Sequence, residues 1–344
     1  MKLIIFVVIL SFCVMPVTAV DISAPTVPEA GEEYMPQSTN FAEGLQELLR
    51  SALGRVRPDL AEASKVCLSL IAAVFMVSIL QSFSGMAKTT TEFAGAVTVA
   101  TVLLLSTNSM IRLGSQTVTE LSAYGKLLLP VMTAALAAQG GVTSSAALYG
   151  GTSVFIAVLG ALISNLLVPL VYLYLALATA NCAMGEDVLK KMRDFLKWLI
   201  SWCLKTMLTV FTTYMGITGV ITGTTDAAAL KATKMTISSF VPVVGSILSE
   251  ASEAVLVSAG IAKNAAGIYG IFAILALFLE PFLRIGAHYL MLKLTAAVCN
   301  VFGEKRATDL IEDFSSAMGF LLGMTGSICL LLLISTVCFL KGAA

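Results

Sequence analysis

The run AMGFLLGMTGSICLLLLISTVCFL, from Ala317 to Leu340, decides the fold class, because it holds no charged residue and is long enough to cross a membrane as one helix. An α-helix needs about 20 mostly apolar residues to span a hydrocarbon layer about 30 Å thick. The sequence contains further apolar runs, at residues 66–83, 93–111, 127–138, 154–184, 198–221, 268–282 and 285–301. It therefore predicts an all-α, polytopic transmembrane helical bundle with about 7–8 membrane segments.

The overall composition supports a membrane protein and argues against two other classes. Of the 344 residues, 58% are hydrophobic and 12% are charged, whereas a soluble domain has roughly 25% charged residues. Basic and acidic residues balance at 21 each, and no basic block is interleaved with aromatic residues, so no nucleic-acid partner is expected. The seven cysteines lack metal-ligand spacing and His288 is the only histidine, so neither a metal nor another cofactor is expected.

The first 64 residues are expected to form three segments ahead of the multi-pass domain at residues 65–344. Lys2, an apolar stretch and small residues ending at Ala19 predict a signal peptide over residues 1–19, with an uncleaved anchor helix as the alternative. Residues 20–40 are rich in proline and glutamate and predict an extended, disordered extracytoplasmic tether. Residues 41–64 follow helical spacing and predict an amphipathic helix that ends near Pro58. This helix would lie on the membrane or the bundle, or would dock a partner.

Two apolar runs are interrupted and predict broken helices. Residues 127–138 are short for a full crossing and contain Pro130, and Gly140 and Gly141 follow, which favours a re-entrant or broken helix. Residues 154–184 are longer than one crossing needs and contain Asn165 and Pro169. They predict either one long tilted helix or two short ones.

The loop expected at residues 186–197 is the most basic in the chain, with Lys190, Lys191, Arg193 and Lys197. Loops with excess positive charge favour the cytoplasmic side, and the tryptophans that follow at 198 and 202 are typical of the membrane interface. We therefore expect this loop in the cytoplasm and the N-terminus outside it.

The stretch GITGVITGTTDAAALKATKMTISSFVPVVGSILSEASEAV, residues 216–255, mixes glycines, hydroxyls and charges in an otherwise apolar chain. Non-helical backbone at membrane depth is stable only where protein or a water-filled cavity satisfies its polar groups, so the stretch predicts a pore-lining or gating element. A surface loop with an interfacial helix is the alternative. The candidate pore or partner-contact residues here are Asp226, Lys231, Lys234, Pro242, Gly245, Glu250 and Glu253.

A second polar group comprises Glu280, Arg284 and His288, which are spaced by four residues and so share one helical face. Ionisable groups at membrane depth usually face a bundle interior, a cavity or a partner, so Glu280 and Arg284 join the candidate residues. Alternatively, Pro281 and Gly286 would place the group in a short loop between two helices. The chain holds no phosphate-binding Gly-rich loop, HExxH motif or serine nucleophile elbow, so an enzyme is not expected.

Residues 216–255, together with KLLLP at 126–130 and the glycine pair at 140–141, resemble the stage III sporulation protein AE family. The resemblance extends over the mature chain. It implies a polytopic protein of an endospore-forming bacterium, made in the mother cell and placed in the membrane around the forespore. It also implies membership of a secretion-like channel complex that links the two cells and is needed for late forespore gene expression. The implied partners are an ATPase, ring-forming proteins and other membrane subunits.

The resemblance favours a non-enzymatic channel, export-gate or scaffold subunit, in contact with membrane lipid and able to form homo-oligomers. The alternative is a secondary transporter or permease with its own small-molecule substrate. Transporters often contain repeated halves with matching broken helices, and residues 127–138 and 240–248 correspond loosely in this way.

Overall fold

The computed structural model describes residues 25–36, 41–83, 88–184, 187–240, 244–301 and 305–342. For α7 beyond residue 218 and most of α8 before residue 260, it describes only the backbone. The helices are α2 (Glu29–Glu32), α3 (Phe41–Phe83), α4 (Lys88–Ala138), α5 (Val142–Leu162), the π-helix η1 (Ile163–Leu167), α6 (Val168–Met184), α7 (Asp187–Phe240), α8 (Val244–Asn300) and α9 (Lys305–Lys341).

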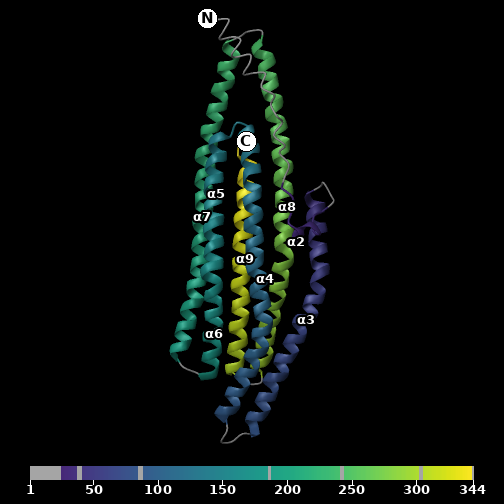
Figure 1. The fold of residues 1–344 in the computed structure, drawn as a ribbon, viewed down its shortest axis with the longest axis vertical. Coiled ribbons are helices and arrows are strands. Elements are labelled where there is room, and N and C mark those ends of the chain that lie inside the picture. The colour runs from purple at the N-terminus through teal and green to yellow at the C-terminus, as the bar shows by residue number, and fades with distance from the viewer. Residues whose placement is uncertain are drawn as a thin grey trace.

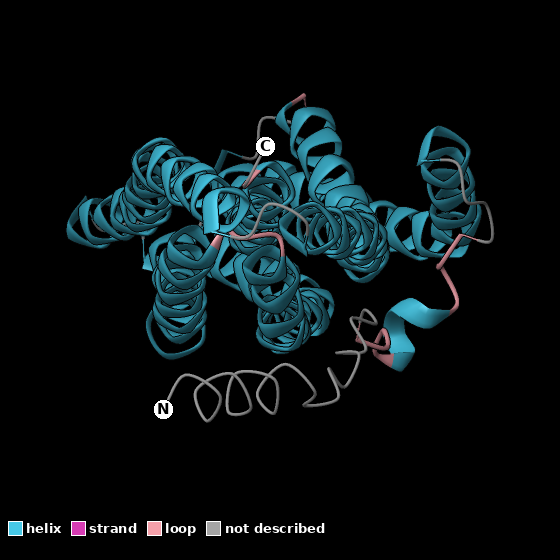
Figure 2. Cartoon of the chain, turned by 90° about the horizontal axis from the view of Figure 1, so that it is seen from above, coloured by secondary structure: helices cyan, strands magenta, loops and turns pink. Residues whose placement is uncertain are grey.

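Successive long helices run antiparallel along one axis, with α5, η1 and α6 forming a single rod (Figure 1). The tips of α7 and α8 extend beyond the rest at one end, and those of α3 and α4 extend at the other (Figure 1). Viewed from above, the long helices pack side by side and the short α2 lies at the periphery (Figure 2). This arrangement confirms the predicted all-α bundle.

The core forms around α9, which packs against α4, α5, α6, α7 and α8. Of the candidate membrane spans, the one in α9 is the most buried and the one in α3 the least. A helix that is apolar on all sides is expected in a protein core or in a membrane, and the 317–340 run lies in the core of this bundle. Large fully buried side chains come from several helices and include Tyr124, Tyr174, Phe211, Phe314 and Phe339.

Three prolines that the sequence suggested as boundaries lie inside continuous helices. Pro58 is inside α3, Pro130 inside α4 and Pro281 inside α8. The amphipathic helix therefore does not end near Pro58, and residues 127–138 are not a separate re-entrant element. Proline is tolerated within a membrane helix when packing and local adjustment compensate for its missing N–H. Around Pro130, for example, Leu128, Leu129 and Met132 are buried in the main core.

These mergers join apolar runs that the sequence suggested as separate segments. Among the described residues, five helical stretches are long and apolar enough to cross a membrane, and the total of about 7–8 segments stays a prediction. They are Phe41–Leu80, Phe93–Ala138, Val142–Met184, Lys263–Asn300 and Lys305–Lys341. The runs at 268–282 and 285–301 belong to the same stretch of α8, and those at 93–111 and 127–138 to the same stretch of α4.

The long apolar run at 154–184 is one rod rather than two short helices. Its irregularity is confined to η1, a π-helical turn that contains Asn165. Pro169 has no N–H to bond the carbonyl of Asn165, so the turn just before it is where the regular hydrogen-bond pattern is most easily changed. By contrast, α4 does end where its glycines predict a break. Gly140 has a left-handed φ of 92°, and the N–H of Gly141 bonds the carbonyl of Leu136 at 3.1 Å.

The structure describes part of the segment that precedes α3. Part of the expected tether, residues 25–36, packs on the bundle, because Val27 and Tyr34 are buried and α2 lies against α8. A few apolar side chains are enough to dock a segment that proline and glutamate otherwise mark as disordered. The predicted signal peptide lies outside the described residues.

Candidate functional site

A polar network between α3, α4 and α8 contains two of the residues chosen from the sequence, Glu280 and Arg284. Both lie in the continuous part of α8, as does His288, so the predicted shared helical face is confirmed and the loop alternative is wrong. The Arg284 Nε atom lies 3.2 Å from Asp59 Oδ1 on α3. This ion pair joins two candidate membrane spans.

His288 extends the network toward α4. Its side chain is buried, and its Nδ1 atom lies 3.5 Å from the Ser106 hydroxyl. Each polar group of this α8 face therefore lies near a helix far away in sequence. Such contacts compensate part of the cost of placing polar groups among apolar helices.

A cavity of about 100 Å³ opens beside Arg284, between α4 and α8. Its polar lining includes Glu280, Arg284, Gln116 and Glu120, and the Gln116 amide donates a 2.8 Å hydrogen bond to Glu120. A polar cavity of this size has room for several water molecules. The site therefore combines two carboxylates, a guanidinium and a hydratable space within the candidate spans.

The segment before α3 covers another side of the network. Glu33 forms an ion pair with Arg55, and the Arg55 guanidinium lies over the Tyr34 ring, 4.8 Å from its centroid. Burial, with the nearby Glu280 carboxylate, raises the pKa of Tyr34 to about 12. The phenol can donate a hydrogen bond to the Glu280 carboxylate, which links this segment to the network.

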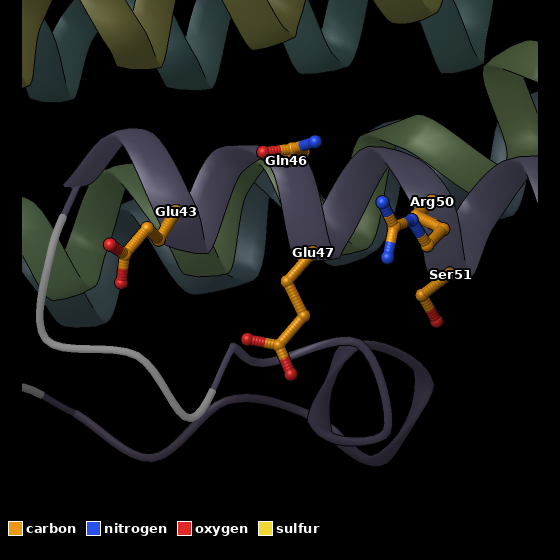
Figure 3. A pocket seen from close by; sticks show the side chains of 5 residues that line it. All are labelled: Glu43, Gln46, Glu47, Arg50 and Ser51. Carbon is orange, nitrogen blue, oxygen red and sulfur yellow. The ribbon is translucent and has the colours of Figure 1, made fainter.

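The outer face of α3 carries a separate shallow pocket lined by Glu43, Gln46, Glu47, Arg50 and Ser51. Figure 3 shows these polar side chains along the first turns of the helix. On the opposite side, Leu48 is buried in a cluster with Phe272 of α8. The predicted amphipathic character is therefore real, and its apolar face packs on the bundle.

Sequence reasoning missed a second buried polar cluster, which joins α6, α7 and α9. The Arg193 guanidinium lies 2.6 Å from Asp313 Oδ2, and the Tyr174 hydroxyl donates a 2.8 Å hydrogen bond to Asp313 Oδ1. Arg193 belongs to the segment expected as a loop, whereas residues 187–197 form the first turns of α7. The signal was the helical spacing that places Asp313 among the buried Leu310, Phe314 and Ala317.

The remaining candidate residues fall at the α7 and α8 tips. The backbone positions of Asp226, Lys231 and Lys234 are helical in α7, and those of Gly245, Glu250 and Glu253 are helical in α8. Pro242 lies outside the described residues. The backbone is therefore helical on both sides of the predicted break, and residues 241–243 at its centre lie outside the described residues.

Comparison with known proteins gives a match over most of the chain. The family model described as stage III sporulation protein AE matches residues 33–342. A protein of that name from Bacillus subtilis (strain 168) is 21% identical over 295 residues, which cover 84% of this chain and 74% of the relative. No solved structure matches significantly.

Proposed function

We propose, because the chain belongs to the stage III sporulation protein AE family, that it is a non-enzymatic membrane subunit of a sporulation channel complex. In this role it would act as a channel, export gate or scaffold between mother cell and forespore, on which late forespore gene expression depends. Its place would be the mother-cell-derived membrane around the forespore. Its partners would be an ATPase, ring-forming proteins and other membrane subunits.

The Asp59–Arg284 ion pair beside a polar cavity is the observation that favours a gate or channel. Ionisable groups inside membrane spans are costly, and they are retained where they line a pathway or meet a partner. Glu120 and Glu280 line the same space, so α4 and α8 both contribute polar groups to it, and α3 supplies Asp59, the ion-pair partner of Arg284. A bundle with only a packing role would be expected to fill this position with apolar side chains.

The charge distribution supports an orientation for this subunit. The end of the bundle where α6 ends and where α7 and α9 begin carries Lys190, Lys191, Arg193, Lys305 and Arg306. Basic residues favour the cytoplasmic side of a membrane. With that end in the cytoplasm, α3 begins on the opposite side, which agrees with an N-terminus exported by a signal peptide.

The permease alternative loses its main support. It relied on a correspondence between residues 127–138 and 240–248, each expected as a broken helix. Residues 127–138 instead complete the continuous α4, and residues 240–248 include the end of α7 and the start of α8. Matching interrupted helices, the feature typical of repeated transporter halves, are therefore not found in this pair.

The proposal is tested by Arg284→Gln and Asp59→Asn, each made in the full chain and expressed in sporulating cells. Each change removes one charge; Asp59→Asn conserves side-chain size, whereas Arg284→Gln also shortens the side chain. Each variant is expected to accumulate in the membrane at the parental level, by immunoblot, and to abolish heat-resistant spores. Ser69→Ala, at an exposed α3 position whose hydroxyl bonds only its own helix, is the control. Parental spore counts in both charge variants would overturn the proposed role of the cavity.

The α7 and α8 tips remain a proposed contact element, because they extend beyond the other helices (Figure 1) and carry Asp226, Lys231, Lys234, Gly245, Glu250 and Glu253. Charged helix tips outside an apolar bundle are suited to contacts with a polar partner surface. Asp226→Ala and Pro242→Leu carry the same expectation of normal accumulation and lost spore formation. If both variants accumulate and sporulate normally, this segment is only a connector.

A further inference from the structure

Residues 25–36, which precede α3, pack against the α8 wall of the polar cavity. Val27 is buried and belongs to the main core together with Leu277 of α8. Leu277 and Glu280 both line the cavity of about 100 Å³ between α4 and α8. The segment therefore supports a wall that the cavity shares with it.

The close fit of this segment depends on Gly31. A β-carbon added at Gly31 would lie 2.8 Å from Val27 Cγ1 and 3.0 Å from Leu277 Cδ2, and both of these neighbours are buried. The N–H groups of Gly31 and Glu32 bond the carbonyl of Pro28, which fixes the turn. The segment therefore has a defined seat on α8.

Polar groups hold the other end of the segment. Tyr34 is buried and hydrogen-bonds the Glu280 carboxylate. Arg55 of α3 lies over the Tyr34 ring and pairs with Glu33, and this ion pair is exposed. Exposed ion pairs contribute little to stability and are screened by salt. This end of the segment can therefore detach at a small cost.

Detachment would leave Glu280 beside a second possible partner. Arg284 follows one helical turn later on the same face of α8, within reach of an (i, i+4) pair with Glu280. Among the ion pairs of the described residues, however, Arg284 is joined to Asp59 of α3. We propose that residues 25–36 form a strap that seals the α8 wall of the cavity and keeps Arg284 paired with Asp59. Release of the strap opens this wall and moves Arg284 to Glu280.

The strap would regulate the gate of the proposed function, and only this regulatory role rests on that function. The two pairing states of Arg284 are properties of the chain itself. They can therefore be tested on the purified full-length protein in detergent micelles, without a spore count.

A cysteine at Thr117 tests whether the strap seals the cavity. Thr117 lines the cavity and is 1% exposed, so Thr117→Cys should react slowly with a small thiol reagent in the parental chain. Mass spectrometry of the labelled peptide separates this site from the native cysteines. Gly31→Leu should raise the labelling rate about tenfold, because overpacking at a buried seat shifts the strap toward its detached state. Gly54→Leu is the matched control and should leave the rate unchanged, because a β-carbon at Gly54 meets no atom within 4 Å.

A cysteine at Ala63 tests the exchange of partners. Ala63 lies one turn after Asp59 on α3 and is 1% exposed, so it should become reactive when the contact between Asp59 and Arg284 opens. Gly31→Leu should raise the labelling of Ala63→Cys. Adding Glu280→Gln should return this labelling to the parental rate, because a neutral side chain does not take Arg284 from Asp59, while Thr117→Cys stays reactive. Equal labelling of Ala63→Cys with and without Glu280→Gln would overturn the exchange.

Two further changes keep the test valid if Gly31→Leu accumulates poorly. Tyr34→Phe keeps the ring but removes the hydrogen bond to Glu280, and it should also raise the labelling of Thr117→Cys about tenfold. A short bismaleimide that joins Glu33→Cys to Arg55→Cys should lower the labelling below the rate before cross-linking. A Thr117→Cys rate that neither Gly31→Leu nor Tyr34→Phe raises, or that the cross-link does not lower, would overturn the strap. Because these rates are independent of the Arg284→Gln spore count, the strap and the proposed function can fail separately.

Discussion

Two buried polar clusters lie in the same apolar bundle and differ in how fully their charges are paired. Asp313 has a partner for each carboxylate oxygen, Tyr174 at 2.8 Å and Arg193 at 2.6 Å, and the Arg193 and Asp313 side chains are 12% and 11% exposed. Arg284 has one contact with Asp59 at 3.2 Å, is 35% exposed and borders a cavity. Both clusters border a polar cavity, since Asp313 lines one of about 140 Å³ with Lys190, Arg306 and Asp309. They differ in pairing: both carboxylate oxygens of Asp313 are bonded, which suits a structural link, whereas Arg284 has a single partner and retains capacity for water, an ion or a partner group.

The largest effect should come from breaking the Arg193–Asp313 cluster. Asp313→Ala removes the buried partner of Arg193, which then keeps only its ion pair with the more exposed Asp194, so it should lower the free energy of unfolding by about 3 kcal/mol. The measurement is thermal or denaturant unfolding of the purified protein in detergent micelles. Tyr174→Phe is the matched control, because it removes one hydrogen bond and should cost about 0.5–1.5 kcal/mol. Equal, small losses in both variants would show that the cluster does not hold α6, α7 and α9 together.

Breaking the Asp59–Arg284 pair should have a smaller effect on stability. Asp59→Asn removes the charge from a pair that is partly exposed, so it should lower the free energy of unfolding by only about 1 kcal/mol or less. The same unfolding assay applies. A loss as large as that of Asp313→Ala would contradict the comparison, because the two clusters would then have the same structural role.

The contrast also shows how far sequence reasoning can go. The four-residue spacing of Glu280, Arg284 and His288 correctly predicted that they share one helical face, because helical periodicity is a local property. It could not supply Asp59 or Ser106, which lie on other helices and are brought close only by the packing of α3 and α4 against α8. Arg193 and Asp313 were missed for the same reason, since 120 positions separate them.

The helix boundaries predicted at prolines were wrong for a related physical reason. Proline lowers helix stability locally, so a sequence pattern marks it as a boundary, yet neighbouring helices can compensate for one missing hydrogen bond. Pro58, Pro130 and Pro281 all lie inside helices that pack on the bundle. Gly140 did mark a true end, because its left-handed φ reverses the chain direction and cannot be accommodated within a helix.

A cysteine substitution that should barely affect stability can show on which side of the membrane the Arg193–Asp313 cluster lies. Lys191 lies two positions before Arg193 on the first turns of α7, so a cysteine there reports which aqueous side this end of the bundle faces. Lys191→Cys at an exposed polar position should leave stability unchanged within about 0.5 kcal/mol. The basic residues at this end predict a cytoplasmic location, so an impermeant thiol reagent should not label it in intact cells and should label it after permeabilisation.

Val142→Cys is the control for the opposite end, because it is 63% exposed at the start of α5, and it should be labelled in intact cells. The unmodified chain gives the background from the native cysteines. Labelling of Lys191→Cys but not Val142→Cys in intact cells would invert the orientation and place the Arg193–Asp313 cluster on the extracytoplasmic side.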